Sequence, residues 1–199
     1  RAHGIATRQL RPAPGLPTSY TDVMSVRATG RRTFFHQRGA NAKLAPRHFN
    51  FKATHARIFH LGYLLLLDTL DEFGADGRPR ACEVLAKARA AGLLTSIDLV
   101  SEASDRFNRI VPLVLPEVDY LFLNDYEATR TTGIEVRPND VISRTAVERA
   151  GEALLRAGVR REIFIHTPEA VYARRQDGAG QWQPSLKVPK DWIAGTAGA

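Results

Sequence analysis

A strand pattern that ends in an asparagine meets a helix pattern that begins with acidic residues in the stretch FLNDYEATRTTG. Asn124 ends the strand pattern, and Asp125 and Glu127 fall in the first turn of the helix pattern. One interpretation is structural: Asn124 caps the helix, and the acids favour its positive end. The other is chemical, because a strand-end Asn with a Glu three residues later offers oxygen ligands to a hydrated Mg²⁺ beside phosphates. The pattern alone leaves both interpretations open.

The stretch GTAGA, residues 195–199, is a second candidate for chemistry. Small residues that lead toward a helix N-terminus leave backbone N–H groups unobstructed. Such groups, together with the helix dipole, bind phosphate or a developing anion.

Strand patterns alternate with helix patterns in the larger part of the chain. Strands are predicted over 56–63, 93–100, 118–124 and 161–167, helices over 78–92, 104–115 and 143–158, and an antiparallel hairpin over 170–175 and 181–188. This alternation predicts right-handed βαβ units and a mainly parallel sheet. Ligands bind beyond the carboxyl ends of the strands in such sheets. Asp98, Asn124, His166 and the loop after Ile193 are therefore the places to look for chemistry.

An earlier hairpin precedes this alternating region. Residues 18–26 and 31–38 are rich in Thr, Val, Phe and Tyr, and the letters ATG lie between them. This is the signal of two strands around a glycine-containing turn. Neither strand is uniformly apolar, so we expect the hairpin to cover something rather than to fill a core.

Composition excludes several classes of function. The 199 residues carry a formal net charge of +7, but the basic residues are scattered, which favours a solvated basic surface or an anionic small molecule over nucleic acid. No run of about 18 apolar residues predicts a membrane span. The single cysteine, Cys82, cannot form an internal disulfide, and this favours a reducing, cytoplasmic setting. Hydrolase, dinucleotide-binding and Walker motifs are absent from the sequence.

Taken in chain order, these stretches resemble the PfkB-type (ribokinase-like) carbohydrate kinases. That family has an Asn-x-x-Glu motif, matched at 124–127, and a later Thr-x-Gly-Ala-Gly-Asp signature, whose beginning is matched at 196–199. The first hairpin and the Gly-Ala-Asn at 39–41 resemble the family's lid strands and the segment after them. The resemblance runs from about Pro17 to Ala199.

The resemblance implies an α/β, ribokinase-like fold, which is a mainly parallel sheet flanked by helices with a small β-hairpin lid. Residues 1–199 would form one partial domain, with the lid hairpin and following segment at 18–43 and the α/β core at 55–199.

The resemblance also implies ATP-dependent transfer of the γ-phosphate to a hydroxyl of a sugar or nucleoside, with ATP and Mg²⁺ bound. The implied nucleotide residues are Asn124, Glu127, Thr196 and His166; the metal residues are Glu127, Asn124 and Asp98; the anion hole is Gly198 and Ala199; the sugar residues are Phe35, Arg38 and Asn41. The alternative to a metal role for Asp98 is a structural role as the acid at a strand end. The alternative to sugar binding for Phe35, Arg38 and Asn41 is packing of the hairpin.

By the same resemblance, the general base is an Asp that would follow Ala199, and the family's first strands have no counterpart before Arg1. We therefore expect a central kinase fragment that is inactive alone. Family members often pair through their lids, and the apolar side chains of the first hairpin would permit a homodimer of this kind.

Three departures from the family pattern support other hypotheses. Gly195 stands where the family usually has an acid, HTPEA at 166–170 stands in place of Thr-x-Gly-x-x-Gly, and Val100 stands where the family often has Asn. A second hypothesis is therefore a non-catalytic ribokinase-like module for ligand binding or assembly. A third is a generic α/β nucleotide-binding domain.

Overall fold

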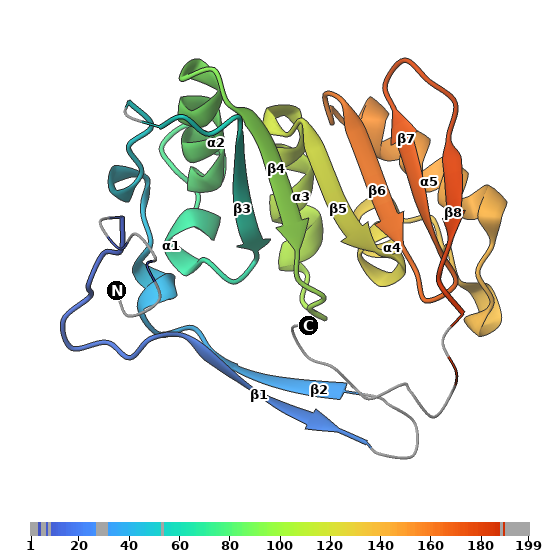
Figure 1. The fold of residues 1–199 in the computed structure, drawn as a ribbon, viewed down its shortest axis with the longest axis horizontal. Helices are drawn as coiled ribbons and strands as arrows, with labels where there is room; N and C mark the ends of the chain where they lie inside the picture. Colours follow the sequence, from blue (N-terminus) through green and yellow to red (C-terminus); the bar gives the residue numbers. More distant parts are fainter. Residues whose placement is uncertain are drawn as a thin grey trace.

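Six strands form one mixed sheet whose order in space is their order in the sequence (Figure 1). The computed structural model describes residues 4, 7, 9–26, 32–52, 54–187 and 189. The strands are β3 (Ile58–Leu64), β4 (Leu94–Leu99), β5 (Tyr120–Asn124), β6 (Glu162–His166), β7 (Ala170–Arg175) and β8 (Gln181–Pro184). β3 to β6 are parallel, and β7 and β8 are antiparallel to their neighbours. The predicted mainly parallel sheet and its terminal hairpin are confirmed.

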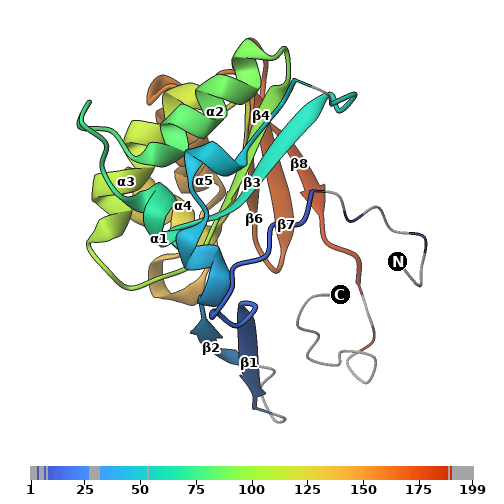
Figure 2. The same ribbon diagram turned by 90° about the vertical axis from the view of Figure 1, so that its left-hand side faces the viewer.

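All the described α-helices lie against the same face of this sheet (Figure 2). They are α1 (Asp68–Asp71), α2 (Arg80–Ala90), α3 (Arg106–Val114), α4 (Asp125–Thr132) and α5 (Arg144–Arg156). Consecutive parallel strands that are also neighbours need right-handed crossovers, and these place every connecting helix on one side. Short 3-10 turns are η1 (Gly39–Lys43), η2 (Pro46–His48), η3 (Leu115–Glu117) and η4 (Pro138–Asp140). No α-helix or 3-10 turn of the described residues is both long and apolar enough to cross a membrane.

The helices form where apolar spacing and capping residues predict them. In α3, Phe107, Ile110, Val111 and Val114 are buried on one stripe, although Pro112 lies inside the helix. Ser143 caps α5, since its Oγ accepts a hydrogen bond from the backbone N–H of Ala146 at 3.4 Å. The predicted helices are thus confirmed, whereas α1 carried no clear signal because a four-residue helix has little periodicity.

The strand β5 presents different residues to its two faces. Leu121 and Leu123 are fully buried on the helix side. Phe122 points to the other face, is 36% exposed, and stacks on Phe164 with ring centroids 4.7 Å apart. This alternation fixes the strand and so fixes the position of Asn124, its last residue.

The first hairpin is a separate two-stranded sheet below the carboxyl ends of the main strands (Figure 1). β1 (Tyr20–Ser25) and β2 (Arg32–Gln37) pair antiparallel, as predicted, and the turn residues 28–30 lie outside the described residues. Arg38 forms an ion pair with Asp68 of α1, and the hydroxyl of Thr69 donates to the carbonyl oxygen of Ala42 at 2.8 Å. These contacts tie the root of the hairpin to the main body.

Leu123→Ala tests how β5 is held. We expect it to lower the free energy of unfolding by about 2–5 kcal/mol, because it opens a cavity beneath the strand. Phe122→Ala is the neighbouring control, and it should cost less because its ring is partly exposed. Urea unfolding of both variants measures the difference, and equal losses would contradict the assignment of faces.

Candidate functional site

The carboxyl ends of the parallel strands bring four predicted residues together. Asn124 of β5 pairs with His166 of β6, and Asp98 of β4 pairs with Phe122, two residues before Asn124. The pKa of Glu127 responds to the charges of both Asp98 and His166, so these groups share one electrostatic neighbourhood. The four residues thus lie at the edge of the sheet where the sequence predicts them, and their role in a functional site stays a prediction.

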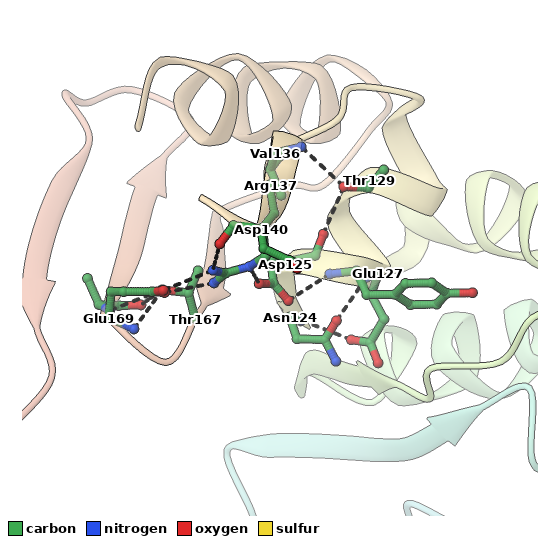
Figure 3. Close-up of polar contacts among 11 residues, drawn as sticks. Asn124, Asp125, Glu127, Thr129, Val136, Arg137, Asp140, Thr167 and Glu169 are labelled. Atoms are coloured by element: carbon green, nitrogen blue, oxygen red, sulfur yellow. Dashed lines mark hydrogen bonds and ion pairs between the residues drawn. The ribbon is translucent and has the colours of Figure 1, made fainter. Parts of the chain in front are cut away.

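Asn124 and Glu127 form a reciprocal capping box at the start of α4 (Figure 3). The side-chain oxygen of Asn124 accepts from the backbone N–H of Glu127 at 2.8 Å, and the backbone N–H of Asn124 donates to Glu127 Oε2 at 2.9 Å. The structure thus confirms the interpretation of Asn124 as a helix cap. The metal role is a separate question, because a carboxylate oxygen keeps acceptor capacity after one hydrogen bond.

Ser101 completes the support of this carboxylate. Its hydroxyl donates to Glu127 Oε1 at 2.8 Å and accepts from the Asn124 side-chain amide at 2.8 Å. Glu127 is only 3% exposed, so its carboxylate is held in one orientation. Sequence reasoning missed Ser101, although its position two residues after β4 was a usable signal.

Burial dominates the electrostatics of the two carboxyl groups. It raises the pKa of Glu127; the hydrogen bonds from Asn124 and Ser101 oppose this rise, and the charge of Asp98 adds to it. Burial also raises the pKa of Asp98, against the hydrogen bond from Leu99 and the charges of His166 and His60. A nearby cation would lower both pKa values by stabilising the ionised forms.

This donor set fits a hydrated Mg²⁺ rather than a metal enclosed by protein ligands. Mg²⁺ keeps several waters and is held by one or two carboxylates together with substrate phosphates. Within the described part of the chain, no group of three or more His, Cys, Asp or Glu residues is arranged to hold a metal ion. Glu127 and Asp98 can orient waters around such an ion, and Asn124 positions Glu127.

Arg137 links α4 to the turn between β6 and β7 (Figure 3). Its Nε donates to Asp125 Oδ2 at 2.5 Å. Its Nη1 and Nη2 donate to the two carboxylate oxygens of Glu169 at 2.9 and 2.7 Å. The bidentate geometry lowers the pKa of Glu169 to about 2. Arg137 therefore ties the first turn of the capped helix to the next strand end.

The turn that contains Glu169 is ordered by its own hydrogen bonds as well. The hydroxyl oxygen of Thr167 accepts from the backbone N–H groups of Glu169 and Ala170 at 3.2 and 3.1 Å. This is the HTPEA stretch that departs from the family's glycine pattern. Neither Arg137 nor Glu169 was predicted, because they are 32 residues apart and lie in loops.

The remaining residues predicted for the site either lie away from the network around Glu127 and Arg137 or fall outside the residues that the structure describes. Phe35 is 56% exposed on β2, Arg38 is paired with Asp68, and the side-chain amide of Asn41 donates to Ser19 Oγ at 2.8 Å. Their contact with a sugar stays a prediction. The residues predicted for the phosphate cradle, Thr196, Gly198 and Ala199, lie outside the described residues.

Comparison with known proteins identifies a family and a fold. The model of the pfkB family carbohydrate kinases matches residues 1–197. Among solved structures, Sa239 is similar with a TM-score of 0.72 and 17% identity, over 95% of this chain and 56% of that one. No curated protein matches the sequence.

Two further structures are similar in fold. Fructokinase from Xylella fastidiosa with bound ATP has a TM-score of 0.62 and 19% identity, over 92% of this chain and 55% of that one. The nucleoside kinase from Burkholderia thailandensis in complex with inosine has a TM-score of 0.59 and 13% identity, over 95% of this chain and 54% of that one. The chain thus spans little more than half the length of these proteins.

Glu169→Gln tests the ion pair with Arg137. The depressed pKa means that the ionised Glu169 stabilises the folded chain above its ordinary pKa of 4.5 and that this stabilisation is lost as the pH falls toward about 2. The difference in unfolding free energy between wild type and Glu169→Gln should therefore shrink from pH 6 to pH 3. Urea unfolding across this range measures it. Glu135→Gln, at an exposed residue, is the control, and a pH-independent difference for Glu169→Gln would contradict the pairing.

Proposed function

The chain belongs to the pfkB family of carbohydrate kinases, and from this premise we propose that its protein transfers the γ-phosphate of ATP to a hydroxyl of a sugar or nucleoside. The observation that carries the proposal is the network of Asn124, Glu127 and Ser101 at the carboxyl ends of the sheet, with Asp98 in the same electrostatic neighbourhood. The ATP-bound fructokinase and the inosine-bound nucleoside kinase support the choice of substrates by analogy of fold.

Phosphoryl transfer depends mainly on positioning and on stabilising charge. Mg²⁺, when bound, neutralises charge on the phosphate oxygens. In our proposal, Glu127 and Asp98 hold the waters of that ion, and Asn124 keeps Glu127 in place. His166, the exposed neighbour of Asn124, lies beside the nucleotide.

The remaining proposed roles concern the phosphoryl group that is transferred and the sugar that receives it. We propose that Thr196, Gly198 and Ala199 donate backbone hydrogen bonds to the transferring phosphoryl group. Phe35, Arg38 and Asn41 close over the sugar, for which Arg38 must exchange its partner Asp68 for a substrate oxygen. Pairing of two copies through β1 and β2, and a cytoplasmic location, are further predictions.

A non-catalytic module for ligand binding or assembly is the second candidate. The specific observation in its favour is the turn at 167–170, where the Arg137–Glu169 pair occupies a stretch that is glycine-rich in the family pattern. A turn tied in this way has less freedom to adapt to a nucleotide. A kinase would consume ATP when its substrate is present, whereas a non-catalytic module would not.

The first measurement is ATP consumption by the intact gene product with Mg²⁺ and a panel of sugars and nucleosides. We expect turnover that depends on one class of substrate. Glu127→Gln should lower kcat by roughly 10²–10³, since a preorganised charge near the phosphates is lost. Glu135→Gln makes the same chemical change at an exposed Glu shortly after α4, and it should leave kcat unchanged. Absence of turnover on every substrate would favour the non-catalytic module.

The 199-residue chain by itself gives a separate prediction. The chain matches little more than half the length of the solved kinases, and we propose that the general base, which contributes roughly 10²–10⁴ in rate, lies in the half that it does not match. We expect no sugar-dependent ATP consumption by the purified chain under conditions in which the intact product is active. Clear turnover by the chain alone would show that another residue serves as the base.

A further inference from the structure

The short helix α1 connects the root of the first hairpin to the main body, and a carboxylate stands at each of its ends. Asp68, its first residue, pairs with Arg38, and Thr69 donates to the segment that follows Arg38. Asp71, its last residue, is 4% exposed. A helix of four residues has too few internal hydrogen bonds to be stable alone. Side-chain contacts therefore hold α1 in place, and Asp71 supplies the polar ones to the main body.

The carboxylate of Asp71 binds two segments of the main body. Its Oδ1 accepts a hydrogen bond from the backbone N–H of Leu65 at 3.1 Å, and its Oδ2 accepts one from Nη2 of Arg106 at 2.8 Å. Leu65 has a φ of 78°, which residues with a side chain rarely adopt, so the first bond stabilises a strained turn between β3 and α1. Burial raises the pKa of Asp71 to about 6, against the hydrogen bond from Leu65 and the charge of Arg106. Asp71 is therefore largely ionised at pH 7, and its bond with Arg106 is charge-assisted there.

Arg106, the first residue of α3, also contacts the loop between β4 and α3. Its Nη1 lies 3.6 Å from Oε2 of Glu102, and its backbone N–H donates to Oγ of Ser104 at 3.2 Å. The hydroxyl of Ser104 donates in turn to Oε1 of Glu102 at 2.5 Å. These contacts order the residues that directly follow Ser101. Arg106 thus binds α1 through Asp71 and the loop through Glu102 and Ser104.

Two side chains of α4 bind the same loop. The hydroxyl of Tyr126 and the guanidinium of Arg130 donate to backbone carbonyl oxygens within 102–104, at 3.1 and 2.8 Å. The loop therefore joins α3 to α4, the helix whose first turn contains Glu127. Ser101, at the start of the loop, donates to Oε1 of Glu127 at 2.8 Å. A displacement of the loop would therefore change the hydrogen bond that orients the Glu127 carboxylate.

We propose that Arg106 is a positioning residue that couples the root of the first hairpin to the orientation of Glu127. The role in phosphoryl transfer rests on the proposed function, in which the hairpin closes over the sugar and Glu127 holds the waters of the metal. Energy passes between two sites when both of them bias the position of the same packed elements. Here those elements are α1 and the loop after β4, and Arg106 is the side chain that binds both.

Hydrogen exchange of single backbone amides, followed by NMR in the intact gene product at pH 7, tests the coupling without substrate, metal or turnover. The N–H of Leu44 reports on the hairpin root, because it closes η1 at 3.1 Å. The N–H of Asn124 reports on Glu127, because it donates to Oε2 of that residue at 2.9 Å. Asp71→Asn removes the charge of the pair but keeps an acceptor for the backbone. We expect both amides to exchange at least about threefold faster, since a charge-assisted hydrogen bond is lost.

Matched variants separate this coupling from a general loss of stability. Arg106→Gln should speed the exchange of the same two amides, and Arg106→Lys, which keeps a cation, should restore part of the protection. Arg109→Gln is the control, since Arg109 lies three residues later in α3, is exposed, and has its guanidinium over the ring of Phe73. It should leave both rates unchanged. Ile163, fully buried in β6, is the reference amide, and its rate should stay unchanged in every variant.

Two outcomes of the exchange experiment overturn the coupling. In the first, Asp71→Asn leaves the rate of the Asn124 amide as in wild type. In the second, the Ile163 amide accelerates as much as the other two, which shows that the pair only stabilises the whole fold.

Steady-state kinetics of the intact gene product test the role of the coupling in the proposed reaction. Asp71→Asn should raise the KM for the accepted sugar and lower kcat, because the hairpin and Glu127 are both displaced. In a double-mutant cycle with Ser101→Ala, the two effects on kcat should be less than additive in free energy, since both act through one hydrogen bond to Glu127. Additive effects, or a rise in KM alone, would overturn the positioning role. Absence of turnover on every substrate would reject the proposed kinase, and the exchange rates would still decide whether the coupling exists.

Discussion

The handedness of the strand–helix–strand connection is the constraint on which the rest of this structure depends. Parallel strands that follow each other in space and in sequence have their crossovers on one side of the sheet. All the described α-helices therefore lie on one face, and the carboxyl ends of β3 to β6 lie at one edge. Polar residues that are far apart along the chain meet at that edge because of this topology alone.

At that edge, the hydrogen bonds that stabilise the start of a helix also orient the carboxylate of the proposed metal site. The capping box of Asn124 and Glu127 satisfies backbone groups that the start of a helix leaves unpaired. It also holds a buried carboxylate in one orientation near a second one, Asp98. Ser101 and Arg137 add supports from two other loops. A helix cap and a candidate metal site are thus the same atoms, and the two interpretations do not compete.

The distribution of charge separates two regions of the molecule. Around the main sheet, arginines are held by carboxylates, and Arg137 is held by two of them. At η1 and η2, Arg11, Lys43 and Arg47 line a hollow and have no carboxylate partner among the residues that the structure describes. The net charge of +7 is therefore partly concentrated in one place rather than spread over a uniform surface.

The sequence by itself determined the strands, the longer helices, both hairpins and the edge of the sheet where Asp98, Asn124 and His166 lie. These features depend on local periodicity, on caps such as Ser143 and on the rule for parallel sheets, all of which are readable along the chain. The family resemblance rested on short motifs in the correct order. Only the tertiary structure decided that Ser101 supports Glu127, that Arg137 binds Glu169, and that the rings of Phe49, Phe51 and Phe59 pack together. Those contacts join loops that are tens of residues apart, and side-chain pairing at such distances follows from packing, which no local pattern encodes.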